Sequence, residues 1–121
     1  MYVLAAIMLI LIGIAHSYLG ERYLLIRLFR REDLPKILGS ETFTKNTLRF
    51  AWHLTTVAWF GFAALLMQMG SGTLELHLVA NVIAITFFVH FLIAIWGSRG
   101  RHLSWVIFLA ISLLMFYANY G

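Results

Sequence analysis

Four apolar runs separated by short polar segments dominate the chain. They cover residues 1–19, 47–69, 74–97 and 102–120. Each run is close to the roughly 20 residues that a helix needs to cross the hydrocarbon core of a bilayer. The pattern therefore predicts an all-α protein with a single domain, a membrane-embedded antiparallel four-helix bundle.

The segment between the first two runs, residues 20–46, is polar and basic. From Arg22 to Arg31, arginines interleave with leucine, isoleucine and phenylalanine, a pattern typical of an amphipathic helix at a membrane surface. Pro35 and Gly39 are expected to end it. We expect this segment either to continue the first span into the cytoplasm or to lie along the lipid headgroups.

The basic residues predict the orientation of the spans. All nine Lys and Arg residues fall within residues 22–49 and 99–101. Because cytoplasmic loops retain Lys and Arg, both stretches are expected on the cytoplasmic side. Both chain termini are then expected on the opposite side of the membrane.

Composition narrows the class of protein further. The chain is 62% hydrophobic and 12% charged, with a mean hydropathy of +0.88, which does not fit a soluble domain. The net charge of +4 is explained by topology and by attraction to anionic lipid headgroups, so we expect no nucleic-acid partner. The chain has no cysteine, which excludes disulfides, iron–sulfur clusters and covalently attached c-type haem.

Three histidines fall inside predicted spans, where ionisable groups are expensive and usually functional. At about 1.5 Å of rise per residue, His53 lies about 6 Å inward from Arg49, His16 about 9 Å from Arg22, and His90 about 13 Å from Arg99. Small or weakly polar residues share the helix face of each histidine. Such faces pack helix against helix in lipid, so we expect the three imidazoles to point toward one another.

This arrangement predicts a transition-metal site for Zn, Cu or Fe, because imidazole is the commonest metal ligand in proteins. The predicted ligands are His16, His53 and His90, with His102 and Glu21 as outer members. Glu21 is five residues after His16, which turns it about 140° from that residue on an unbroken helix. It is expected to join only if the helix deforms at Gly20.

Other functions use the same residues. Haem b is an alternative cofactor, with axial histidines and cytoplasmic arginines for its propionates. A cofactor-free scaffold or accessory membrane subunit, or a homo-oligomer, is a second alternative. In that case each buried histidine only hydrogen-bonds a threonine or a backbone carbonyl. Proton conduction is a less favoured hypothesis, because the outer halves of three spans have almost no polar residues to continue a proton path. No motif assigns an enzymatic activity.

Two short motifs add a resemblance. The segment His16 to Glu21 reads H-S-Y-L-G-E, and Trp52 to Leu54 reads W-H-L. With these, the chain resembles a family of small, uncharacterised bacterial four-span membrane proteins that carry H-S-x-L-G-E after span one and W-H-L in span two. The resemblance implies a bacterial inner membrane and no particular activity.

Overall fold

The computed structural model describes residues 1–72 and 74–121, and this part of the chain is helical with no strand. Helix α1 spans Tyr2–Leu19 and continues through the π-helix η1, Gly20–Leu25, and the short α2, Ile26–Leu28. The remaining helices are α3 (Glu41–Ser71), α4 (Leu76–Gly97) and α5 (Ser104–Tyr120). The all-α prediction is confirmed.

Three of these helices are long and apolar enough to cross a membrane. They are Tyr2–Leu28, Glu41–Ser71 and Leu76–Gly97, and Ser104–Tyr120 is a shorter apolar helix. The first two are longer than their predicted spans, because each extends into the basic segment between them. Helix length and composition therefore suggest a membrane protein.

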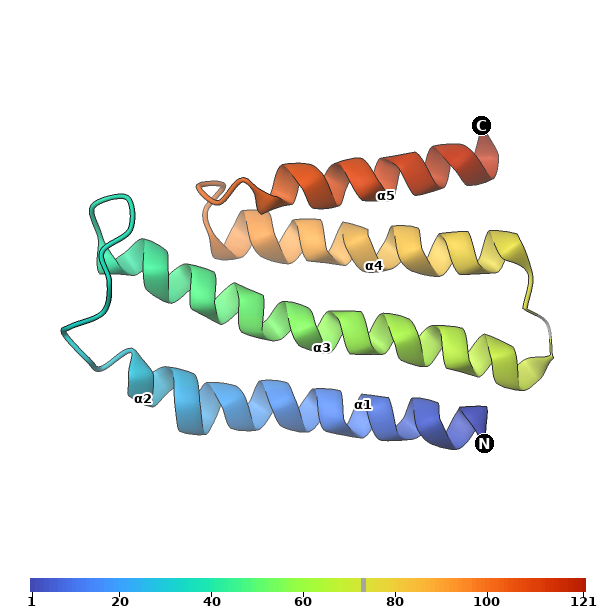
Figure 1. Cartoon of the computed structure of the whole chain (residues 1–121), viewed down its shortest axis with the longest axis horizontal. Helices are drawn as coiled ribbons and strands as arrows, with labels where there is room; N and C mark the ends of the chain where they lie inside the picture. Colours follow the sequence, from blue (N-terminus) through green and yellow to red (C-terminus); the bar gives the residue numbers. More distant parts are fainter. Residues whose placement is uncertain (73) are drawn as a thin grey trace.

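The four long helices form an open row (Figure 1). Within the described residues, α1 packs on α3, α3 on α4, and α4 on α5, and no other pair of these helices packs together. The chain reverses direction at each connection, so the two basic connections lie at one end of the row and both termini at the other (Figure 1). The row leaves α1 and α5 as its edges, whereas a closed bundle would bring them together.

Small residues allow the helices to approach closely. A Cβ atom added at Gly13 would lie 2.8 Å from the Phe60 ring, and one at Gly61 would lie 2.6 Å from Thr86 Oγ1. The expectation that faces with small residues pack helix against helix is confirmed at both positions. Alanines also contribute to the core, with Ala6, Ala63, Ala84 and Ala94 buried.

Helix α3 begins six residues before the predicted span. Ser40 is its N-cap, and its hydroxyl accepts a hydrogen bond from the backbone N–H of Phe43 at 3.4 Å. Glu41 and Lys45 form an i,i+4 ion pair at 3.5 Å, which supports an exposed helical turn. The helix therefore begins within the segment predicted to connect the first two spans, residues 20–46, and the predicted bound of the second span at residue 47 stays a prediction. The predicted connection at 70–73 includes Thr73, which lies outside the described residues.

Helix α1 continues through η1 and α2 toward the basic connection. This agrees with the expectation that the amphipathic segment continues the first span, rather than the alternative that it forms a separate helix along the headgroups. Helical structure ends at Leu28, and a turn follows. There, Arg31 pairs with Asp33 through contacts of 2.6 and 2.8 Å. This guanidinium holds the pKa of Asp33 below its usual value. The ion pair is exposed, so we expect it to add little stability.

Candidate functional site

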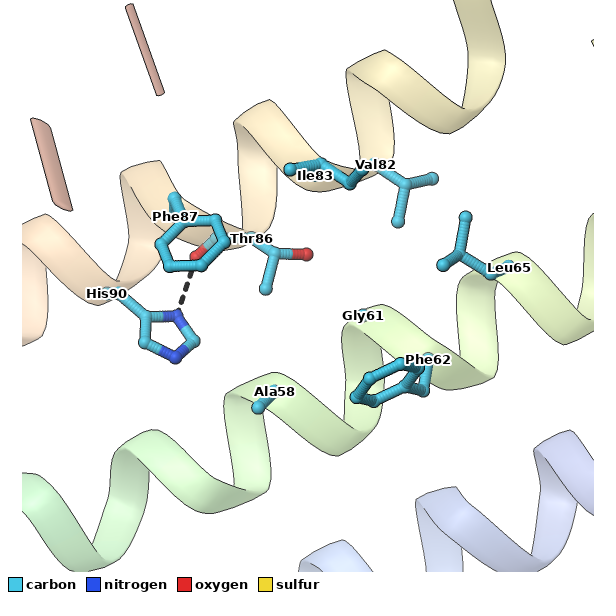
Figure 2. A pocket seen from close by; sticks show the side chains of 9 residues that line it. All are labelled: Ala58, Gly61, Phe62, Leu65, Val82, Ile83, Thr86, Phe87 and His90. Atoms are coloured by element: carbon cyan, nitrogen blue, oxygen red, sulfur yellow. Dashed lines mark hydrogen bonds between the residues drawn. The ribbon is translucent and has the colours of Figure 1, made fainter. Parts of the chain in front are cut away.

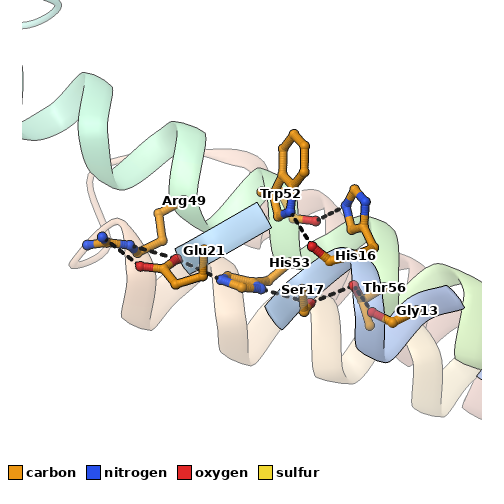
Figure 3. Close-up of polar contacts among 8 residues, drawn as sticks. All are labelled: Gly13, His16, Ser17, Glu21, Arg49, Trp52, His53 and Thr56. Carbon is orange, nitrogen blue, oxygen red and sulfur yellow. Dashed lines mark hydrogen bonds and ion pairs between the residues drawn. The ribbon is translucent and has the colours of Figure 1, made fainter. Parts of the chain in front are cut away.

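A row of polar side chains joins α1 and η1 to α3 (Figure 3). We call this row the polar ladder. Ser17 Oγ lies 2.9 Å from His53 Nδ1, and His53 Nε2 lies 3.2 Å from Glu21 Oε2. Arg49 then pairs with Glu21, with Nη2 2.8 Å from Oε1. Hydroxyl, imidazole, carboxylate and guanidinium groups thus follow one another toward the basic end of the row. The members of the polar ladder are Ser17, Glu21, Arg49, His53 and Thr56.

The ladder follows from helical spacing on two antiparallel helices. Ser17 and Glu21 are four residues apart, as are Arg49 and His53, so each pair shares a helix face. At the ladder's inner end, Ser17 Oγ lies 2.6 Å from Thr56 Oγ1, and Thr56 donates to the backbone carbonyl of Gly13 at 3.2 Å. Interhelical hydrogen bonds of this kind are the usual way to satisfy polar groups inside a membrane.

The π-helix accompanies the placement of Glu21 in the ladder. η1 begins at Gly20, where the sequence analysis required a deformation for Glu21 to join a histidine. The helix does deform there, and Glu21 contacts His53 rather than His16. Single π-turns within α-helices are frequent at functional sites. The local geometry therefore marks the Glu21 end of the ladder as a candidate site.

His16 has a different environment, on the other side of the contact between α1 and α3. Its ring stacks on Trp52 with centroids 4.3 Å apart and planes at 5°. Its Nε2 donates to the Trp52 carbonyl at 3.2 Å, and Trp52 Nε1 donates to the His16 carbonyl at 3.0 Å. This reciprocal pair requires close approach at Gly20, where an added Cβ would lie 2.1 Å from Trp52 Nε1.

His90 lies between α4 and its neighbours, away from the polar ladder. Its side chain is 7% exposed, and its Nδ1 lies 2.8 Å from the backbone carbonyl of Thr86 one turn earlier. The rings of Phe87 and Phe108 each lie 5.3 Å from it. His90 therefore packs against aromatic rings of α4 and α5 and also lines a cavity between α3 and α4.

His102 precedes α5, at the basic end of the row. Its ring stacks on Phe43 at 5.9 Å and meets Phe50 edge-on at 5.3 Å. Its Nδ1 lies 2.9 Å from Ser104 Oγ. It has no contact with the other predicted ligands in the described structure.

Of the five predicted site residues, the structure brings together only Glu21 and His53. His16, His90 and His102 each lie among aromatic rings of their own. Within residues 1–72 and 74–121, no group of three or more His, Asp or Glu side chains is placed to hold a metal ion. The metal and haem sites stay predictions, and the structure provides hydrogen-bonding roles for these histidines.

All members of the polar ladder except Arg49 line a groove between α1 and α3, with a volume of about 660 Å³. Its polar members are Ser17, Glu21, Arg22, His53 and Thr56, and its apolar members are Ile14, Tyr18, Ile26 and Phe60. The His53 and Glu21 side chains are each 31% exposed, so the groove reaches them directly. His53 also borders a second groove of about 400 Å³ toward α4, together with Arg49.

Arg22 and Ser17 are residues of this groove that the sequence analysis did not select. Arg22 is exposed and forms no ion pair in the described part of the chain; its guanidinium lies 6.0 Å from the Tyr23 ring. Ser17 could have been found from its spacing, since it lies one turn before Glu21. Searches against protein-family models, curated proteins and solved structures find no match to this chain.

Proposed function

We propose that this chain is a four-span protein of the bacterial inner membrane that binds the headgroup of an anionic lipid in the groove between α1 and α3. In this role it is an accessory membrane protein without a cofactor. The observation that carries the proposal is the composition of this groove. Charged and hydrogen-bonding side chains line it together with apolar side chains.

The helix lengths and the charge distribution support the proposed topology. Helix α5 has 17 residues, about 26 Å at 1.5 Å per residue, which approaches the roughly 30 Å hydrocarbon thickness. The basic connections lie at one end of the helix row (Figure 1). The positive-inside rule then favours a cytoplasmic location for that end, with both termini outside.

The charges of the groove support an anionic headgroup. Glu21 is compensated by Arg49 at 2.8 Å, whereas Arg22 has no carboxylate partner in the described residues. A phosphate group near Arg22 would supply that partner, because guanidinium and phosphate form strong charge-assisted hydrogen bonds. Ile14 and Phe60 also line the groove, as an apolar surface along which an acyl chain would lie.

A metal site is the second candidate, reduced to two protein ligands. Glu21 Oε2 and His53 Nε2 converge at 3.2 Å on the groove, and both atom types bind Zn²⁺. Catalytic and structural zinc sites use three or four protein ligands, so a two-ligand site would bind weakly. The ion pair with Arg49 also competes for the carboxylate.

Native mass spectrometry tests lipid binding directly. The protein is purified into detergent with equal amounts of phosphatidylglycerol and phosphatidylcholine, and the lipids that stay bound are counted. We expect preferential retention of phosphatidylglycerol by the wild type. Because one basic residue contributes about 1 kcal/mol to attraction of anionic lipid, Arg22→Gln is expected to lower this retention about fivefold.

Arg30→Gln is the matched control. Arg30 belongs to the same basic segment but does not line the groove. A headgroup site predicts a much larger effect at Arg22 than at Arg30. Equal effects of the two substitutions would mean general surface attraction and would contradict the proposal.

A further inference from the structure

A cavity separate from the α1–α3 groove lies between α3 and α4 (Figure 2). Its volume is about 160 Å³, and its side chains are apolar except for Thr86 and His90. His90 lies at one end of the cavity, and Leu65 and Val82 lie at the other (Figure 2). An apolar cavity of about 150 Å³ in another protein is large enough for benzene, so this cavity has the size for one aromatic ring.

His90 gives the cavity one polar atom of defined character. Its Nδ1 lies 2.8 Å from the Thr86 carbonyl oxygen. A carbonyl oxygen can only accept a hydrogen bond, so Nδ1 carries the hydrogen and donates it. In the neutral ring, Nε2 then has a lone pair and no hydrogen. His90 lines the cavity and is 7% exposed, and no hydrogen bond to its Nε2 is present among the described residues.

Aromatic contacts hold this acceptor in place. Phe87 lies 5.3 Å from the imidazole at a tilt of 37°, and Phe108 of α5 lies 5.3 Å away at 72°. These contacts restrict rotation of the ring. The acceptor is thus a fixed feature of the cavity wall, available to a ligand that supplies a donor.

We propose that this cavity binds a neutral aromatic ring bearing a hydroxyl group, which donates a hydrogen bond to His90 Nε2. A phenol or the ring of a lipid hydroquinone has this chemistry. The apolar wall, including Phe62, Leu65 and Val82, contacts the ring and its substituents. A charged ligand is disfavoured here, because burying an unpaired charge costs far more than burying a neutral group.

Ligand titration of the purified full-length protein in detergent, with ¹⁵N-labelled histidine, tests the proposal. The probes are phenol and toluene, which have similar shape and differ in the hydroxyl. We expect phenol to bind about fivefold more tightly than toluene, since one net hydrogen bond has about that effect on an equilibrium constant. Phenol, and not toluene, is expected to shift the Nε2 resonance of His90.

A variant and a second ligand complete the test. His90→Leu is expected to remove the preference for phenol while toluene still binds, and the wild-type resonance gives the answer if this variant does not fold. Equal binding of phenol and toluene, binding of neither, or an unshifted Nε2 resonance would overturn the proposal. If a hydroquinone with an alkyl tail binds more tightly than phenol, the ligand is a membrane lipid. If the two bind equally, the ligand is a soluble phenol.

Discussion

Glu21 and His53 meet at 3.2 Å across the contact between η1 and α3, although 32 positions separate them in the sequence. The contact links two kinds of interaction. On one side of His53 are the hydroxyls of Ser17 and Thr56, and on the other side of Glu21 is the guanidinium of Arg49. Loss of this one contact would divide the polar ladder into a hydroxyl part and an ion pair.

Gly20→Ala tests the close approach that accompanies the π-helix. An added Cβ would lie 2.1 Å from Trp52 Nε1, so α1 and α3 must separate or the indole must move. We expect the overpacking cost of about 1–3 kcal/mol to exceed the roughly 1 kcal/mol that alanine adds to helix propensity. The free energy of unfolding in mixed detergent and SDS micelles, followed by circular dichroism, measures the difference.

Trp52→Leu provides the control for this substitution. Without the indole, the added methyl group has space, and Gly20→Ala should then become neutral or stabilising. If Gly20→Ala has the same cost in both backgrounds, the proximity of Gly20 and Trp52 does not explain its effect.

A double-mutant cycle measures the inner end of the ladder. Ser17→Ala and Thr56→Val each remove one hydroxyl of the 2.6 Å contact. We expect a coupling energy of roughly 0.6 kcal/mol, the average for interhelical hydrogen bonds in a membrane. The same cycle with the neighbouring Thr55→Val should give a coupling near zero, and a value as large as that for Thr56 would argue against a specific bond.

Elemental analysis and a visible spectrum test the cofactor hypotheses. We expect less than one equivalent of Zn, Cu or Fe per chain and no Soret band. The reason is that Nε2 of His16 and Nδ1 of His90 are already engaged with backbone carbonyls. If the wild type binds one equivalent of metal and both His16→Gln and His90→Gln lose it, the result would contradict this expectation and support the three-histidine site.

Cysteine labelling tests the orientation of the helices. The chain has no native cysteine, so single substitutions at the exposed Lys36 and Glu75 can be compared without background. In intact cells, a membrane-impermeant maleimide should label Glu75→Cys and not Lys36→Cys, because Lys36 belongs to the basic connection. After cell lysis both should react. Labelling of Lys36→Cys in intact cells would reverse the proposed topology.

The sequence was sufficient to predict where the helices lie but not where each helix begins and ends. Hydropathy predicts apolar helices because each run is long and continuous, and the structure has a helix in each. It does not locate the beginning of α3, where Ser40 and the pair Glu41 and Lys45 extend the helix beyond the apolar run. These are local polar interactions, and hydropathy averages over them.

The candidate site was predicted only in part, for a geometric reason. Depth along each helix placed three histidines in one layer, but depth says nothing about the direction of a side chain around the helix axis. His16 and Ser17 are adjacent and therefore point about 100° apart on a helix, so only Ser17 reaches His53. The partner of His16 is Trp52, whose backbone carbonyl no sequence pattern identifies as an acceptor.

Disulfide cross-linking in native membranes tests most directly whether α1 and α3 meet through the polar ladder. Ser17 and Thr56 are in hydrogen-bond contact, so cysteines at both positions should come within the roughly 3.8 Å Cβ separation of a disulfide. We predict rapid cross-linking of the Ser17→Cys/Thr56→Cys pair on mild oxidation, and little in the adjacent control, Tyr18→Cys/Thr56→Cys. Faster cross-linking of the control pair, or none in either, would contradict the account.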